Sequence, residues 1–274
     1  KEADLSEWDQ VLENIQSADT TSNVMIVGKY TDFTDTYKSI NEALFHAGIQ
    51  TKTNVKLHYA EAASLESMDE TELAATFAGM DAILIPGGFG ERGIEGKIRA
   101  IQYVRENKIP FLGLCLGMQL AVVDYARNVL GLSGANTSEV DPTVAYPVIQ
   151  MLDPQRDAET DEFRGYMTVG AQPSTLVEGT RAYEAYGQAD VSERHRHRYG
   201  VNLEYLDQLQ DGNFVISGRT NDRGLVEFVE LKEHPWFVGT QSHPEFKSTP
   251  RDGHPLFIAF IKAAKAVKEA KAAK

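Results

Sequence analysis

The stretch GLCLGMQ, residues 113–119, decides how the rest of the sequence is interpreted. It places Cys115, the only cysteine in 274 residues, between Gly113 and Gly117. An apolar run, IPFLGL, precedes Cys115 and a helical pattern follows it, as in a nucleophile elbow, where a strand turns sharply into a helix. The glycines allow neighbouring backbone to approach the turn, and the helix N-terminus favours the thiolate that attacks carbonyl carbons. The alternative is that Cys115 is a small buried hydrophobic residue.

On both sides of this stretch, short apolar strands alternate with helical patterns, which is typical of a parallel sheet covered on both faces. After about residue 145 the strand-like runs follow one another through short turns. We therefore predict one α/β domain with a mostly parallel central sheet flanked by helices and an added mixed-sheet portion. Strands are expected at 23–30, 53–59, 81–88, 109–115, 146–151, 166–173, 214–220, 225–231 and 236–242, and helices at 5–16, 69–79, 93–107, 116–130 and 252–268.

Composition restricts the possible partners and location of the chain. Its 27 basic and 40 acidic residues give a net charge of −13, which argues against binding to nucleic acid or to an anionic membrane. No apolar stretch is long enough to span a bilayer, and one cysteine permits no internal disulfide, so we expect a cytoplasmic protein. The acidic stretch DPQRDAETDEF, residues 153–163, is expected to be a mobile surface loop.

Two further stretches supply partners for a cysteine nucleophile. In TQSHPEFK, residues 240–247, an extended backbone would place His243 and Glu245 on one face, as a base and the carboxylate that orients it. In PGGFGERG, residues 86–93, the glycines match a dinucleotide fingerprint, but the match falls on a late strand–helix unit, so we reject that interpretation. We expect instead that the amides of Gly88 and Leu116 hold an oxyanion. A turn that needs glycine only for its conformation is the alternative.

These motifs together resemble the class I glutamine amidotransferases. The stretches ERHRHRY and PRDGHPLF, with GLCLGMQLAVVDYAR and PGGFGERG, narrow the resemblance to the glutaminase domains of CTP synthases. The resemblance implies a flavodoxin-like core. It also implies that residues 1–20 are the end of a linker from an amino-terminal synthetase domain, and that residues 21–274 are the amidotransferase domain. A GMP synthetase-type amidotransferase is the alternative within enzymes, and a non-catalytic module that senses glutamine or docks a partner is the alternative outside them.

The resemblance also implies roles for particular residues. Cys115 would be the nucleophile, His243 the base and Glu245 the orienting acid of a glutaminase. Glu139 would pair with the α-ammonium of L-glutamine and Arg198 with its α-carboxylate. The implied glutamine contacts are Gly88, Leu116, Gly117, Met118, Gln119, Glu139 and Arg198.

The remaining implied ligands belong mainly to the full-length enzyme. ATP and Mg²⁺ would act in the synthetase domain, and that enzyme would be a homotetramer. GTP would be an allosteric activator, sensed by Phe89 and Arg92. This domain would need no cofactor of its own. We also expect no metal, because no cysteine or further histidine cluster accompanies His195 and His197 in ERHRHRY.

Overall fold

A nine-stranded sheet forms the centre of the computed structural model, which describes residues 3–156 and 163–272. The strand order is β10-β9-β12-β13-β14-β4-β3-β1-β2. The strands of the parallel half are β1 (Thr20–Gly28), β2 (Thr53–Glu61), β3 (Ala82–Ile85), β4 (Phe111–Leu114) and β14 (Phe237–Thr240). The antiparallel extension consists of β9 (Thr168–Leu176), β10 (Asp190–His197), β12 (Phe214–Thr220) and β13 (Val226–Leu231). The predicted α/β fold with an added mixed-sheet portion is therefore confirmed.

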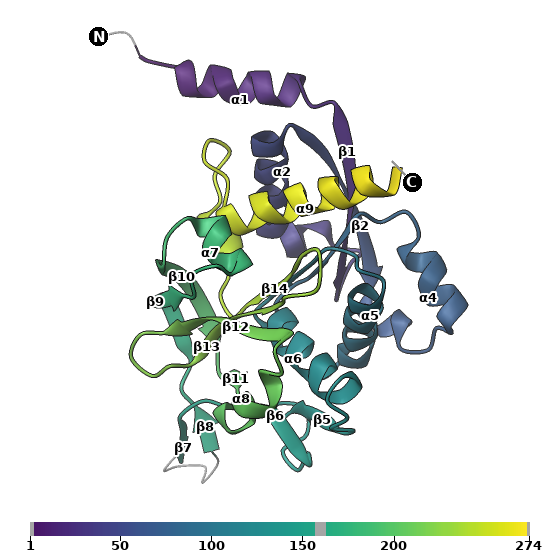
Figure 1. Cartoon of the computed structure of the whole chain (residues 1–274), viewed down its shortest axis with the longest axis vertical. Helices are drawn as coiled ribbons and strands as arrows, with labels where there is room; N and C mark the ends of the chain where they lie inside the picture. Colours follow the sequence, from purple (N-terminus) through teal and green to yellow (C-terminus); the bar gives the residue numbers. More distant parts are fainter. Residues whose placement is uncertain (1–2, 157–162, 273–274) are drawn as a thin grey trace.

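The parallel strands are apolar because helices cover the sheet on both faces (Figure 1). Every residue of β3, β4 and β14 is buried. The helices on one face are α4 (Glu70–Phe77), α5 (Ile94–Glu106) and α6 (Leu116–Asn128). Those on the other face are α2 (Lys38–Thr51), α7 (Arg181–Tyr186) and α9 (Pro255–Ala272). Pro255 begins α9, where its missing N–H costs no intrahelical hydrogen bond.

Three neighbouring parallel strands end at the same edge of the sheet. β4 lies between β3 and β14, and all three run in one direction. The chain leaves β3 into the loop that contains Gly88, leaves β4 into Cys115 and leaves β14 toward His243. Ligands bind at such carboxyl ends in open α/β sheets, so the fold brings the three predicted motifs together.

Smaller elements complete the molecule. Two minor sheets contain β5 (Ala135–Thr137), β6 (Tyr146–Met151) and β11 (Tyr199–Val201) in one, and β7 (Pro154–Arg156) and β8 (Phe163–Gly165) in the other. The short helices are α3 (Ala62–Leu65), α8 (Leu206–Leu209) and the 3₁₀ turns η1 (Thr34–Tyr37), η2 (Leu203–Tyr205) and η3 (Pro244–Lys247). None of the helices in the described ranges combines the length and the apolarity that a membrane crossing requires.

Several sequence-based boundaries differ from the structure, and two of the differences change the description of a segment. β1 begins at Thr20, three residues before the expected start at Asn23, because the polar residues before Asn23 pair in register with Thr53 and its neighbours on β2. The acidic stretch 153–163 is not entirely a loop, because Pro154–Arg156 pairs with Phe163–Gly165 as an antiparallel ribbon. The rest of that stretch, 157–162, lies outside the described residues.

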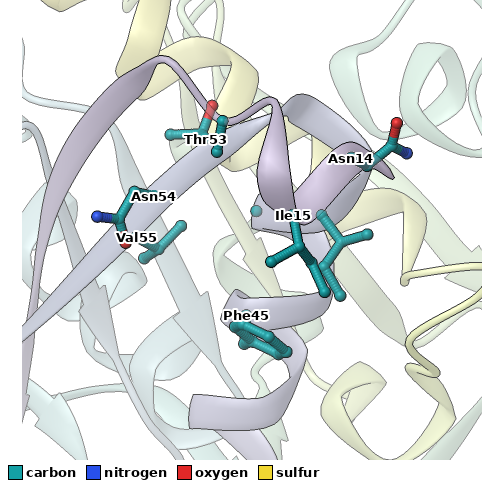
Figure 2. Close-up of a pocket in the computed structure, with 9 residues that line it drawn as sticks. Asn14, Ile15, Phe45, Thr53, Asn54 and Val55 are labelled. Carbon is teal, nitrogen blue, oxygen red and sulfur yellow. The ribbon is translucent and has the colours of Figure 1, made fainter. Parts of the chain in front are cut away.

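The first helix, α1 (Ser6–Gln16), is the helix predicted at 5–16, and its large apolar side chains are mostly exposed. Trp8 is 51% and Leu12 55% exposed. A hollow of about 170 Å³ separates this helix from α2 and β2, with Ile15 and Phe45 on opposite walls (Figure 2). None of the residues predicted for the catalytic site lines this hollow. The boundary predicted at residue 20 remains a prediction.

Candidate active site

Cys115 stands at a strained turn between β4 and α6. Its backbone has φ 51° and ψ −104°, a conformation that costs a non-glycine residue about 1–3 kcal/mol. The Cys115 amide donates to the Thr240 carbonyl at 2.7 Å, which joins the turn to the end of β14. Glycine is required at Gly117, because a Cβ there would lie 2.2 Å from the Ile85 carbonyl oxygen. The turn is the sharp strand-to-helix elbow predicted from the sequence.

His243 reaches Cys115 from the neighbouring strand and is held by Glu245. The Nδ1 atom of His243 lies 2.8 Å from Oε1 of Glu245, a carboxylate whose side chain is only 5% exposed. Burial by itself lowers the pKa of His243, but hydrogen bonds with Cys115 and Glu245 outweigh that effect and raise it to about 10. An ideal Cβ at Gly87 would lie 2.7 Å from Cε1 of His243 and 3.4 Å from Cβ of Cys115, so the imidazole and the cysteine are neighbours.

The backbone that makes this contact differs from the expected one. Residues 244–247 form the 3₁₀ turn η3, whereas the sequence predicted an extended chain through His243 and Glu245. Pro244 occupies the first position of the turn, where its fixed φ is favourable and its missing N–H is not needed. The tight turn folds Glu245 back under the imidazole, so the predicted contact forms by a different local geometry.

The predicted oxyanion donors come from adjacent strand ends. Gly88 follows β3, and Leu116 is the first residue of α6, whose amide has no acceptor within its own helix. An ideal Cβ at Gly88 would lie 3.6 Å from Cδ2 of Leu116, so the two residues are neighbours. This proximity supports the prediction that the two amides donate to one oxyanion, but it does not test it.

Glu139 and Arg198, the predicted partners of the amino-acid zwitterion, both lie close enough to Tyr199 for their charges to act on its hydroxyl. Burial raises the pKa of Tyr199, the Glu139 charge raises it further and the Arg198 charge lowers it, so both charges act on one phenol. Oε1 of Glu139 also accepts from the amide of Gly90 at 3.0 Å, which places this carboxylate at the glycine-rich loop.

Two other predicted glutamine contacts, Met118 and Gln119, have side chains that are less available to a ligand. Met118 is fully buried and packs against Gly239, so only its main chain can face a ligand. Gln119 uses its amide nitrogen for the Tyr199 carbonyl at 2.8 Å and for Oε1 of Gln241 at 3.1 Å. The Gln119 side chain therefore holds Tyr199 and Gln241 in position near the site.

Phe89 and Arg92 lie at the outer end of the same loop. The guanidinium of Arg196 is 5.7 Å from the centre of the half-exposed Phe89 ring. Arg92 pairs with Glu61 at 3.1 Å and lies 5.1 Å from the centre of the Tyr30 ring. Both residues are accessible, as the GTP prediction requires, but they face different neighbours.

Comparison with known proteins decides the family. The family model for class I glutamine amidotransferases matches residues 32–263. The chain belongs to this family. It is 36% identical to the *Trypanosoma brucei* CTPS glutaminase domain solved with bound acivicin, with a TM-score of 0.82, and the match covers 89% of this chain and 94% of that one. A glutamine amidotransferase from *Methylobacillus flagellatus*, 12% identical, shares the fold, with a TM-score of 0.51 and coverage of 82% and 71%.

The structure also explains why two distinctive motifs of this amidotransferase occur together. Glu193 of ERHRHRY is buried and accepts hydrogen bonds from Nε2 of His254, in PRDGHPLF, at 3.0 Å and from the Tyr186 hydroxyl at 3.1 Å. Burial raises the pKa of Glu193, but His254, Lys247 and Tyr186 outweigh it and lower the value. Lys247, at the end of η3, also donates to the Ser192 carbonyl at 2.6 Å. The cluster fixes β10 against the turn that carries Glu245.

Two residues near the amidotransferase cysteine were missed from the sequence. Nε2 of Gln241 lies 3.6 Å from Sγ of Cys115. Lys97 is buried beneath the glycine-rich loop, with Nζ 3.7 Å from an ideal Cβ at Gly88, and burial together with the Lys29 charge lowers its pKa to about 7. It lines a cavity of about 430 Å³ that also reaches Gly87 and His243. The only available signal was position, since Gln241 lies two residues before His243 and Lys97 four after Gly93.

Proposed function

We propose that this domain hydrolyses the side-chain amide of L-glutamine to glutamate and ammonia through a thioester on Cys115. The observation that carries the proposal is the contact of the His243 imidazole with the Glu245 carboxylate, beside the turn that holds Cys115. A cysteine nucleophile needs a base, and the base needs a group that fixes its orientation. The acivicin bound to the *Trypanosoma brucei* relative, a glutamine analogue, is consistent with such a site.

Each step follows from the residues around the sulfur. The thiolate attacks the amide carbon, and the amides of Gly88 and Leu116 stabilise the oxyanion, each contributing about 3 kcal/mol. His243 donates its proton to the departing ammonia as the carbon–nitrogen bond breaks, which leaves a γ-glutamyl thioester. His243 then removes a proton from water, the hydroxide attacks the thioester, and glutamate leaves while the thiolate is regenerated.

We assign substrate recognition to two opposite charges near Tyr199. Glu139 pairs with the α-ammonium of glutamine, and Arg198 pairs with its α-carboxylate. Because both charges are required, the pair selects a free amino acid over a glutamine residue within a peptide.

In the whole enzyme, the ammonia passes to a synthetase domain that aminates UTP to CTP. ATP and Mg²⁺ act in that domain, whereas GTP activates the coupling through Phe89 and Arg92 of this one. Support for this part of the proposal comes from the 36% identity to a CTPS glutaminase domain over most of both chains. The cytoplasmic location and the homotetramer of the whole enzyme belong to the same proposal.

The first prediction concerns the covalent intermediate. The diazo-oxo-norleucine analogue of glutamine should alkylate Cys115, forming a carbon–sulfur bond with loss of dinitrogen. Peptide mass spectrometry should find the label on the peptide that contains Cys115, and an excess of glutamine should protect it. A protein that binds glutamine and never forms this adduct would be a sensor, and the enzymatic proposal would be wrong.

A second prediction concerns Glu245→Gln. The neutral amide cannot stabilise the imidazolium, so the raised pKa of His243 should fall and the proton donor should be lost at lower pH. We expect turnover to fall about 10²–10⁴-fold. In a pH profile of the rate of Cys115 alkylation by the diazo-oxo-norleucine analogue, the decline at high pH (the alkaline limb) should move to lower pH. Glu139→Gln is the control, since it should raise the KM for glutamine and leave that alkaline limb in place. An unshifted limb in Glu245→Gln would contradict the orienting role.

A further inference from the structure

The face of β10 that points away from the arginines carries two buried histidines. His195 and His197 are 4% and 3% exposed, whereas Arg194 and Arg196 alternate with them on the exposed face. The glutaminase mechanism uses neither imidazole, so their burial has no explanation in that reaction.

Both imidazole rings are oriented in the same way. Nδ1 of His195 lies 3.1 Å from the Glu193 carbonyl oxygen, and Nδ1 of His197 lies 2.9 Å from the Tyr199 carbonyl oxygen. A carbonyl oxygen can only accept, so Nδ1 of each ring carries the proton and donates it. Histidines that bind metals are held by this arrangement, which leaves Nε2 to face the ion.

A carboxylate from a distant strand completes the cluster. Oε2 of Glu227, on β13, lies 2.6 Å from Nε2 of His195. Nε2 of His197 is buried and has no hydrogen-bond partner within the described residues. The candidate ligand atoms of the three residues all lie within 4.8 Å of one another. The sequence did not reveal this acidic partner, because only cysteine and further histidines were considered as ligands beside His195 and His197.

The cluster opens onto a cavity of about 300 Å³ that is lined in part by His197 and Glu227. The cavity has room for water as a fourth ligand. Arg223 lines it as well, and its positive charge would oppose a cation. That charge is offset because Arg223 is paired with Asp153, while Asp222 also faces the cavity.

We propose that His195, His197 and Glu227 bind a divalent transition-metal ion, with zinc as the ion that best fits the donor set. Two imidazole nitrogens, one carboxylate oxygen and a water from the cavity give the tetrahedral shell that zinc prefers. Zinc takes the place of the proton between His195 and Glu227, and that proton is released to solvent. The carboxylate neutralises part of the charge of the ion in the buried site.

Binding here would act on the glutaminase site through β10. The amide of His243 donates to the Arg194 carbonyl at 2.7 Å, and the Cys115 thiol lies 3.9 Å from the Arg196 carbonyl. An ion bound to His195 and His197 therefore fixes the strand whose main chain contacts two members of the proposed triad. This link between the two sites rests on the proposed function, whereas metal binding itself does not.

The test must separate this cluster from Cys115 and His243, whose thiol and imidazole are also ligand types for zinc. Calorimetric titration of zinc into the Cys115→Ser protein should give one ion per chain. In that background, His197→Asn should weaken binding about tenfold or more, because Asn can still donate to the Tyr199 carbonyl but offers no ligand in place of Nε2. His58→Gln, at a histidine outside the cluster, should bind zinc as the parent does.

Cobalt(II) bound to the wild-type protein provides an independent readout. Coordination by nitrogen and oxygen gives visible d–d bands without the intense thiolate-to-cobalt charge-transfer band that a Cys115 ligand would add. We expect d–d bands that persist after alkylation of Cys115 and disappear in His197→Asn. The metal-free variant should retain the circular dichroism spectrum of the parent. The proposal is wrong if the Cys115→Ser protein binds no zinc, or if His197→Asn binds it unchanged.

Discussion

Replacing Cys115 with alanine is expected to abolish glutamine hydrolysis, with a loss of about 10⁴-fold or more in turnover. Alanine offers no atom that can form the thioester, and the oxyanion donors alone retain only weak catalysis. The change removes a single buried sulfur atom, so the domain should remain folded. Glutamate release, followed by a coupled dehydrogenase assay, measures the loss.

The single cysteine provides a matched chemical control for this variant. Alkylation of the wild-type protein with iodoacetamide should remove turnover to the same extent, and it should have no effect on residual turnover in Cys115→Ala. Circular dichroism should show the same secondary structure in all three samples. Substantial hydrolysis by the folded variant would mean that another group is the nucleophile.

Replacing Gly117 with alanine is expected to destabilise the domain by about 3 kcal/mol, because the elbow has no room for a methyl group. The added Cβ would lie 2.2 Å from the carbonyl oxygen of Ile85, and neither backbone can move without displacing a strand or a helix. At this chain length we expect the melting temperature to fall by about 6–12 °C. Turnover should also fall, because displacement of α6 moves the Leu116 amide.

Gly88→Ala is the control for the steric argument. An ideal Cβ at Gly88 has its nearest neighbours at 3.6 and 3.7 Å, which is ordinary van der Waals contact. This variant should therefore keep its melting temperature even though it changes the site. Equal melting temperatures for Gly117→Ala and the wild-type protein would show that the close approach at the elbow does not limit stability.

The part of the site that could be predicted from sequence depends on short-range patterns. A buried strand, a glycine-flanked cysteine and a helical pattern define the elbow within about 20 residues. The His243–Glu245 contact spans two residues and survives the change from an extended chain to a 3₁₀ turn. Parallel strands end at one edge of a sheet, which predicts that these motifs share that edge, but the sequence does not show that β14 pairs with β4.

The contacts that could not be predicted join residues through the packing of distant elements. Glu227 of β13 meets His195 of β10 although β9 and β12 lie between these strands in the sheet order, so neither the residue types nor the strand order indicates the contact. Gln241 turns toward Cys115 only because β14 lies beside β4. The buried position of Lys97 follows from the packing of α5, whose sequence alone suggests that a lysine faces solvent.

The contact between Glu193 and His254 has a consequence for the carboxyl end of the chain. His254 directly precedes α9, and that helix places Phe257 and Phe260 in the core between α2 and the sheet. Removing the chain from His254 onward would leave Glu193 without the hydrogen bond from the His254 imidazole. It would also remove a contact that holds β10, the edge strand that lies behind His243. If the shortened protein loses glutaminase activity, the carboxyl-terminal segment with α9 supports the position of His243, even though no residue of that helix is assigned to glutamine.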